Sequence, residues 1–421
     1  MVSVVSDRVT NRSDNQPQGK HGIAGRMLAR VATAQFLGMT LWFSATAAGP
    51  AIAAELSLSR SATAWLTMAV QAGFVAGTLL SALLTLADVL NPRRLFAFGC
   101  LVGAIANASI PFASVPSHVI ALRAVTGMAL ACVYPPGLKI AAGWFLDRRG
   151  TALGVVVGAL TIGSAFPHLL AWGTQAVAWR GLMWISSMLA IAGGCLVWLA
   201  VEDGPHVSAS APFDPRAVLE VARNRGARLA TLGYLGHMWE LYAMWTWMPA
   251  FAAASIIARY GEAGRMGSLV TFVAIATGAV GCVVAGRWAD EFGQARIARL
   301  AMMTSAACAA AAGFVFGAPL SVLFLFSAVW GFSVVADSAQ FSALVSEYSA
   351  RTHVGTALTL QTCLGFLLTI GSIRMLPWFA AMAGWQWAFL LLVPGPLAGA
   401  AAMWRLMKEQ ELGAPGTPGT R

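Results

Sequence analysis

The sequence predicts an all-α membrane protein with twelve transmembrane helices, arranged as two pseudo-symmetric bundles of six. Three observations predict this fold: an apolar composition, twelve apolar stretches of spanning length, and a repeat that relates the two halves of the chain. Hydrophobic residues make up 58% of the 421 residues and charged residues only 10%, whereas a soluble domain carries about 25% charged residues. The mean hydropathy of +0.70 points the same way.

The apolar stretches are long enough to cross a bilayer, whose hydrocarbon core takes about 20 helical residues. Gly and Pro occur inside many of them, as membrane helices tolerate. The short alternating segments of transmembrane strands do not occur in the sequence. The twelve predicted spans are 29–53, 63–87, 95–114, 117–143, 151–175, 181–201, 228–257, 266–288, 297–316, 319–345, 353–379 and 385–407.

The longest polar interruption lies between the sixth and seventh spans and divides the chain into two halves. Neither half contains a Cys pair in a loop or a C-x-x-C motif, so the sequence indicates no disulfide framework, metal site or cofactor. The predicted organisation is a disordered N-terminal tail (1–26), an N-terminal bundle (27–201), a linker (202–227), a C-terminal bundle (228–408) and a C-terminal tail (409–421).

The net charge of +10 reflects membrane orientation. Basic residues gather in the two tails and in the loops that lie on the same side as the tails. Only four basic residues fall in loops on the opposite side: Arg60, Arg180, Arg259 and Arg265. Because basic loops stay in the cytoplasm, both termini are expected there, in the inner membrane of a bacterium. Nucleic acid is not an expected partner.

The two halves repeat each other at a slowly drifting offset. Gly150 begins the sequence GTAL, which recurs at Gly355, 205 positions later. Trp179 at the start of the sixth span matches Trp385 at the start of the twelfth, 206 positions later. Parallel six-helix halves related by an axis along the membrane normal are a transporter architecture.

The loop after the eighth span and the start of the fourth span carry family motifs. The loop GRWADEFGQAR contains Gly286, Asp290 and Arg296, and its counterpart LTLADVLNPRR contains Asp88, Arg93 and Arg94 but lacks the glycines. The fourth span reads ALRAVTGMALA, with the pattern R-x-x-x-G. Over residues 27–408 the chain resembles the major facilitator superfamily, and the anion and cyanate permeases of bacteria within it. The antiporter signature of the fifth span is not met.

The resemblance implies two groups of functional residues. The loop residues are expected to form a charge lock that restrains the inward-closed form, with Asp290 paired to Arg296 and placed against the start of the eleventh helix. Spans 1, 4, 7 and 10 are expected to line a central cavity. The charge-lock residues are Asp88, Arg93, Arg94, Gly286, Asp290 and Arg296.

Ionisable residues inside the spans are candidates for substrate binding and coupling, since lipid does not solvate them. His237 and Glu240 are three residues apart and share a helix face. We expect Glu240 to face the cavity and carry a proton, with His237 tuning its pKa; the alternative is a structural hydrogen bond in a helix kinked by Pro249. The tryptophans of the cavity-lining spans, such as Trp42 and Trp245, form either packing or an organic-substrate wall.

The remaining candidates lie in spans 4, 5, 10 and 11. Asp337, with Gln340 near it, aligns with Tyr134 in the other half, and Asp337 either acts in coupling or is fixed to a basic residue. Arg123 is either a substrate anchor, because Arg binds oxyanions bidentately, or a relay and structural residue. His168 and Arg374 align between the halves and are considered as an outer gate.

The function that these features favour is proton-coupled secondary transport of a small anionic solute by alternating access, in a monomer that binds only substrate, protons and lipid. Basic groups in one half and titratable groups in the other suit an anion carried with protons. The alternative is proton-driven efflux of drug-like compounds or metabolites. The sequence has no H-E-x-x-H, G-x-S-x-G or His/Cys cluster, so an enzyme is not expected.

Overall fold

The computed structural model describes residues 18–84, 86–145, 149–173, 178–206, 223–350 and 353–413, and in these ranges the chain forms helices and turns without strands. Residues 1–17, most of the predicted linker and residues 414–421 lie outside the described residues. The helix of the first span begins at Gln18, inside the predicted disordered tail. The all-helical fold predicted from the composition is confirmed.

The N-terminal half contains the first six predicted spans. Its helices are α1 (Gln18–Met39), α2 (Ser44–Ala47), α3 (Gly49–Glu55), α4 (Arg60–Leu83), α5 (Leu86–Val89), α6 (Pro92–Ser109), η1 (Ile110–Phe112), α7 (Pro116–Leu130), α8 (Tyr134–Ala142), α9 (Arg149–Gly173) and α10 (Trp179–Ala200).

The C-terminal half contains the other six. Its helices are α12 (Arg225–Tyr260), α13 (Met266–Phe292), α14 (Gln294–Ala311), η2 (Ala312–Phe314), α15 (Leu320–Ala336), α16 (Ser338–Tyr348), α17 (Val354–Trp387), η3 (Ala388–Leu392) and α18 (Pro394–Glu411).

Ten helical stretches of the described chain are long and apolar enough to cross a membrane. The last of them, Val354–Glu411, is 58 residues long and holds two predicted spans. Gly384 breaks it with a φ of 79°, a conformation that residues other than Gly rarely adopt. The first predicted span is divided between α1, α2 and α3. Together these account for the twelve spans.

Three spans are interrupted near the middle of their length. The first span turns at residues 40–43, between α1 and α2. The fourth divides into α7 and α8 at residues 131–133, and the tenth into α15 and α16 at Asp337. Broken helices are tolerated inside a membrane only where protein groups satisfy the freed backbone.

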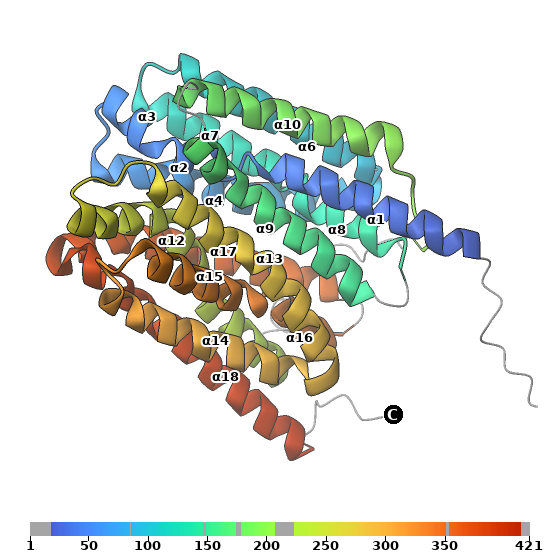
Figure 1. Cartoon of the computed structure of the whole chain (residues 1–421). Coiled ribbons are helices and arrows are strands. Elements are labelled where there is room, and N and C mark those ends of the chain that lie inside the picture. The colour runs from blue at the N-terminus through green and yellow to red at the C-terminus, as the bar shows by residue number, and fades with distance from the viewer. Residues whose placement is uncertain are drawn as a thin grey trace, which may run out of the picture.

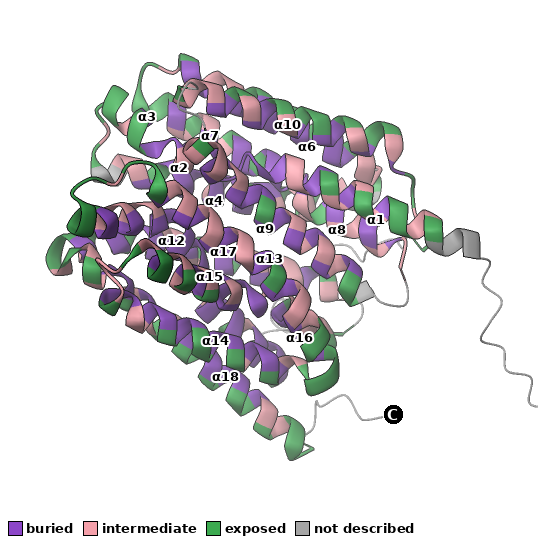
Figure 2. Ribbon diagram, viewed as in Figure 1, coloured by how far each residue is buried: buried purple, intermediate pink, exposed green. Residues whose placement is uncertain are grey.

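The two halves lie side by side and meet through two helix pairs (Figure 1). Helix α9 packs against α13, and α4 packs against α17. Helices α6 and α10 cover the far side of the N-terminal half, and α14 and α18 that of the C-terminal half. Figure 2 shows that these covering helices carry much of the exposed surface, while buried residues gather between the halves.

At the end of the bundle remote from the start of α1 and the end of α18, an ion pair joins α3 to α10. Glu55 accepts hydrogen bonds from Arg180 and from the indole nitrogen of Trp179, the latter at 2.8 Å. These hydrogen bonds, that of Arg180 above all, hold the pKa of Glu55 below its ordinary value. Both side chains of the ion pair are partly exposed, so the contact positions the loop more than it stabilises the fold.

In each half, a glycine allows two neighbouring spans to approach closely. A Cβ at Gly127 of α7 would lie 2.1 Å from the carbonyl oxygen of Val70 in α4. The repeat places a similar contact in the other half, where a Cβ at Gly331 of α15 would lie 1.7 Å from the carbonyl oxygen of Ala274 in α13. Both glycines therefore face backbone that cannot move aside without separating two helices.

We predict that Gly127→Ala destabilises the folded protein by roughly 1–3 kcal/mol, the usual cost of overpacking. The added methyl group must push α7 away from α4. The effect is measured as the melting temperature of the detergent-purified protein, with size-exclusion chromatography after heating as the readout of the folded fraction. Gly154→Ala is the matched control, since a Cβ there meets no atom within 4 Å. Equal melting temperatures for the two variants would contradict the close contact.

Candidate functional site

A histidine and an aspartate meet at the break of the tenth span. His237 lies on α12, and its Nδ1 is 2.8 Å from Oδ1 of Asp337, at the junction of α15 and α16. Nε2 of the same ring is 3.1 Å from the hydroxyl of Ser338. Both side chains of the pair are almost completely buried. The expected coupling residues of spans 7 and 10 are therefore in direct contact.

Glu240 points away from this contact, into the interior of the C-terminal half. Its Oε1 accepts hydrogen bonds of 2.7 Å from Ser305 of α14 and from the indole nitrogen of Trp330 of α15. A residue three positions further along a helix is turned by about 60°, enough to direct Glu240 towards α14. We expected Glu240 to face the central cavity; here it is enclosed by its own half.

Gln340 supports the break in the tenth span. Its side-chain amide donates to the carbonyl oxygen of Ala336, the last residue of α15, at 3.1 Å. Tyr134, which aligns with Asp337 in the repeat, is the first residue of α8 and is half-buried. Both residues thus lie at the breaks of their spans, Gln340 with a backbone partner.

Arg123 uses its guanidinium to satisfy backbone carbonyls at the break of the first span. Nη1 donates to the carbonyl oxygen of Leu41 at 3.0 Å, and Nη2 donates to that of Trp42. Nε donates to the carbonyl oxygen of Leu66 in α4 at 2.9 Å. The side chain is completely buried. Of the two roles that the sequence left open, these contacts favour the structural one.

A polar network extends from Arg123 across the N-terminal half. Nη1 also contacts the hydroxyl of Ser44, at 3.3 Å, and this hydroxyl donates to the side chain of Asn107 in α6 at 2.7 Å. The amide of Asn107 in turn donates to the hydroxyl of Ser187 in α10, at 3.0 Å. The network joins four spans through uncharged side chains and one charge.

The residues expected to form a charge lock are arranged differently from the prediction. Arg93 pairs with Asp203, at the end of the sixth span, at 2.8 Å. Asp290 and Arg296 are both exposed, and no ion pair joins them in the part of the chain that the structure describes. A Cβ at Gly286 would meet open space. The predicted ion pair of Asp290 with Arg296 is therefore absent in this conformation, and the predicted contact of Asp290 with the start of the eleventh helix stays a prediction.

Two charge-lock residues add little further information. Arg94 is exposed, and the side chain of Asp88 lies outside the described residues, as do Arg351 and Thr352 before the eleventh helix.

The expected outer gate between His168 and Arg374 does not form either. His168 is completely buried in α9, whereas Arg374 is exposed on α17, so the two side chains do not face a common space.

Aromatic rings close the space between the two halves at mid-depth. The rings of Trp42 and Phe43, at the break of the first span, lie 5.7 Å and 6.3 Å from that of Tyr242 in α12. Phe74 of α4 lies 4.7 Å from Phe366 of α17. We call this set the central aromatic cluster; it comprises Trp42, Phe43, Phe74, Tyr242, Trp245 and Phe366.

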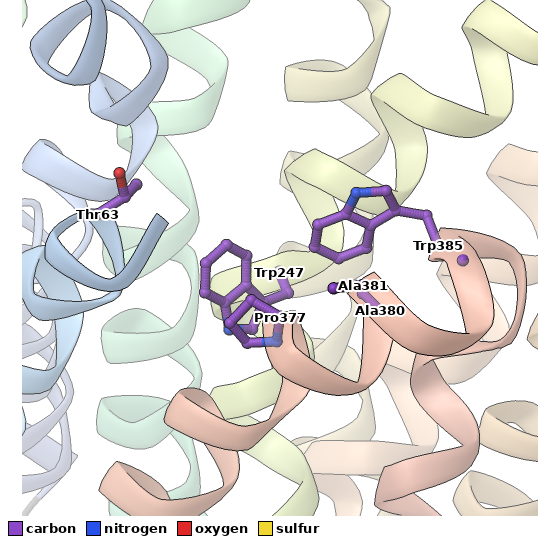
Figure 3. A pocket seen from close by; sticks show the side chains of 7 residues that line it. Thr63, Trp247, Pro377, Ala380, Ala381 and Trp385 are labelled. Atoms are coloured by element: carbon purple, nitrogen blue, oxygen red, sulfur yellow. The ribbon is translucent and has the colours of Figure 1, made fainter. Parts of the chain in front are cut away.

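Two cavities lie between the halves, towards the end of the bundle that is remote from the start of α1 and the end of α18. One, of about 320 Å³, is lined by Thr63 of α4 and by Trp247 and Trp385, whose rings are 5.8 Å apart. Figure 3 shows Thr63 facing these indoles from the opposite half. The other, of about 260 Å³, is rich in threonine and lies above the central aromatic cluster, because Thr46 and Thr246 line it.

The tryptophans singled out from the sequence therefore divide into different roles. Trp42 and Trp245 belong to the central aromatic cluster and Trp247 lines both cavities. Trp239 donates to the carbonyl oxygen of Leu391, and Trp330 to Glu240. The first group faces the space between the halves, as an organic-substrate wall requires, while the second serves packing within the C-terminal half.

The comparison with protein families decides the identity of this fold. Residues 31–258, more than half of the chain, match the family described as Major Facilitator Superfamily. The chain belongs to this superfamily. The fold resembles that of the nucleoside transporter NupG, with a TM-score of 0.70 at 15% identity, over 90% of this chain and 99% of that chain. At this identity the likeness concerns the fold alone.

Curated relatives from the superfamily match about a third to a half of the chain. A galacturonate transporter of Dickeya chrysanthemi is 27% identical over 44% of this chain and 53% of its own length. A hexuronate transporter of Escherichia coli is 25% identical over 44% and 43%. A puromycin resistance protein of Streptomyces alboniger is 30% identical over 35% and 30%. The chain thus spans about half, or less, of the length of these relatives.

Sequence reasoning missed the uncharged partners of the buried charges. Ser305, Trp330 and Ser338 contact the ionisable residues of the C-terminal half. In the N-terminal half Ser44 contacts Arg123, and Asn107 is the next partner of Ser44. Ser is common in these helices, so its presence carries no signal. Asn107 is an exception, because an amide inside an apolar span needs partners of its own.

We predict that Arg123→Gln lowers the stability of the purified protein by on the order of 3 kcal/mol, because it leaves carbonyls at the break of the first span unpaired. Differential scanning fluorimetry measures the shift in melting temperature. Arg374→Gln, on an exposed site, is the matched control. If Arg123→Gln melts normally but no longer binds substrate, Arg123 is a substrate anchor instead.

Proposed function

We propose that this protein carries a small organic anion of the sugar-acid class, together with protons, across the cytoplasmic membrane of a bacterium by alternating access. The observation that carries the proposal is the buried contact between His237 and Asp337, with Glu240 one turn away on the same helix. Ionisable groups inside a membrane bundle commonly mark proton pathways, because their burial is costly.

The position of Asp337 suggests how a proton acts on the conformation. With Asp337 ionised and His237 protonated, attraction holds α12 against the junction of α15 and α16. A proton on Asp337 removes this attraction and lets the two halves of the tenth span move relative to α12. Such a step biases one of two conformations, which is what coupling requires.

Glu240 has a second, supporting place in the proposal. Its two hydrogen bonds come from donors, Ser305 and Trp330, which suit an ionised carboxylate. We assign the transported proton to Asp337, and we assign to Glu240 a supporting role, in which its hydrogen bonds hold α12 against α14 and α15.

The substrate class is inferred from the relatives and from the space between the halves. Transporters named for galacturonate and hexuronate match the chain over 44% of its length. The walls of the two cavities combine indole rings with threonine hydroxyls. Rings of this kind pack against the apolar face of a sugar, and hydroxyls bind its polar edge.

The proposal also covers the orientation of the protein in the membrane and its partners. The start of α1 and the end of α18 lie on the same side of the bundle (Figure 1), and the basic loops favour a cytoplasmic location for this side. The cavities between the halves then open towards the outside. The protein is proposed to work as a monomer with substrate, protons and lipid as its partners, each half moving against the other.

We predict that Asp337→Asn abolishes accumulation driven by a pH gradient in proteoliposomes, while exchange of substrate down its own gradient survives. One proton per cycle supports about tenfold accumulation per pH unit, since one unit corresponds to 1.36 kcal/mol. Glu240→Gln, whose amide oxygen still accepts from Ser305 and Trp330, should reduce accumulation less. The exposed Glu262→Gln is the matched control. Accumulation by Asp337→Asn equal to that of the wild type would refute the coupling role.

Efflux of drug-like compounds is the second candidate, favoured by the puromycin resistance relative and by the central aromatic cluster. The two functions differ in substrate and in direction. We predict that proteoliposomes with an imposed pH gradient accumulate labelled galacturonate and that expression in cells leaves puromycin sensitivity unchanged. Puromycin resistance without uptake of any carboxylate would select the alternative.

A further inference from the structure

Trp42, beside Phe43 in the chain, has a buried indole nitrogen without a hydrogen-bond partner within the described chain, and three more such atoms belong to side chains whose rings contact that of Phe43. Two of them are Nδ1 and Nε2 of His168, on α9, and the third is Nε1 of Trp245, on α12. The two side chains are 0% and 1% exposed. They come from opposite halves of the protein, so the motion of the halves changes the distance between them.

Such atoms call for a physical explanation. A buried donor or acceptor without a partner costs about 1–3 kcal/mol, and most buried polar groups in folded proteins are paired. His168 makes none of the contacts that explain the other buried ionisable groups, since Arg123 has its carbonyls and His237 its aspartate. Packing does not explain it either, because a phenyl ring would fill a similar volume without the cost.

Phe43 contacts both of these side chains. Its ring lies 6.3 Å from that of His168 and 5.9 Å from that of Trp245, and it stacks on Tyr242 with an interplanar angle of 14°. Phe43 belongs to the turn that interrupts the first span, immediately before α2. A shift of this turn would therefore move a ring that contacts both side chains.

A cavity leads to this position from the outer end. The threonine-lined cavity of about 260 Å³ includes Thr46, three residues after Phe43, and Thr246, which follows Trp245. Thr46 and Thr67 face each other there with hydroxyl oxygens 2.7 Å apart. Phe43 and Trp245 do not line the cavity themselves, but each is close in the chain to a residue that does.

We propose that Phe43 closes a carboxylate-binding site, in which His168 and Trp245 donate hydrogen bonds to the carboxylate of a hydroxylated acid. The indole nitrogen is always a donor, and a neutral imidazole donates from one of its nitrogens, so each binds one carboxylate oxygen. The hydroxyl groups of the acid then meet Thr46, Thr67 and Thr246, and its ring replaces that of Phe43 against Tyr242. The proposal rests on the proposed function, since it requires an anionic substrate.

The test measures binding and stability on the same detergent-purified, full-length proteins. Calorimetric titration with galacturonate, lactate and benzoate, with uncharged galactose for comparison, gives the affinities. His168→Phe and Trp245→Phe keep the aromatic volume and remove the donors, whereas His168→Gln keeps one. Trp239→Phe is the matched control on the same helix as Trp245, because its indole nitrogen bonds the carbonyl oxygen of Leu391 inside the C-terminal half.

We expect His168→Phe and Trp245→Phe each to weaken binding of the preferred carboxylate at least tenfold, and His168→Gln to weaken it no more than about threefold. Because His168→Phe removes buried polar atoms that have no partners, its melting temperature should equal or exceed that of the wild type. If the imidazole had a purely structural role, the melting temperature would fall. Trp239→Phe should bind as the wild type does.

The remaining outcomes also decide the question. If the wild type binds a carboxylate and both phenylalanine variants bind it equally well, the site proposed here is wrong while the proposed function stands. If the wild type binds none of the carboxylates, the anionic substrate class and this site are both wrong. If His168→Phe loses binding and also melts at a lower temperature, the imidazole stabilises the fold and does not bind the carboxylate.

Discussion

The guanidinium of Arg123 satisfies the backbone where the first span is interrupted, and the N-terminal half is arranged around this contact. Carbonyls freed by a break in a membrane helix find no water to bind, so a protein donor must reach them. Arg123 reaches those of Leu41, Trp42 and Leu66 at once, which fixes the break against α4 and α7. Through Ser44 the same contact extends to α6 and α10.

The C-terminal half meets the same constraint with different chemistry. At the break of the tenth span, Gln340 bonds the carbonyl oxygen of Ala336, and Asp337 meets His237 of α12. A permanently charged guanidinium makes a fixed support, whereas a carboxylate and an imidazole can change charge. The asymmetry suits a division of labour in which one half provides a rigid frame and the other responds to protons.

The central aromatic cluster connects these two breaks. Trp42 and Phe43 belong to the turn that Arg123 supports, and they pack on Tyr242 and Trp245, which lie on the helix of His237. A change at the break of the tenth span acts on α12, and α12 carries the rings that cover the first. Rings that pack without hydrogen bonds separate more readily than a polar interface, because the indole nitrogens of Trp42 and Trp245 have no hydrogen bond to lose.

The sequence by itself determined the helical membrane fold, the two halves and the ionisable residues inside them. These follow from the composition, the length of the spans and the rarity of charge in lipid, all of which are local properties. Only the tertiary structure decided what each ionisable residue faces. Residues three apart on one helix, such as His237 and Glu240, turn towards different neighbours, and the partners of Arg123 include backbone atoms that no sequence pattern marks. The contact of Asp290 with Arg296 was wrong for the same reason, since a loop motif fixes residue types while the packing of the helices fixes distances.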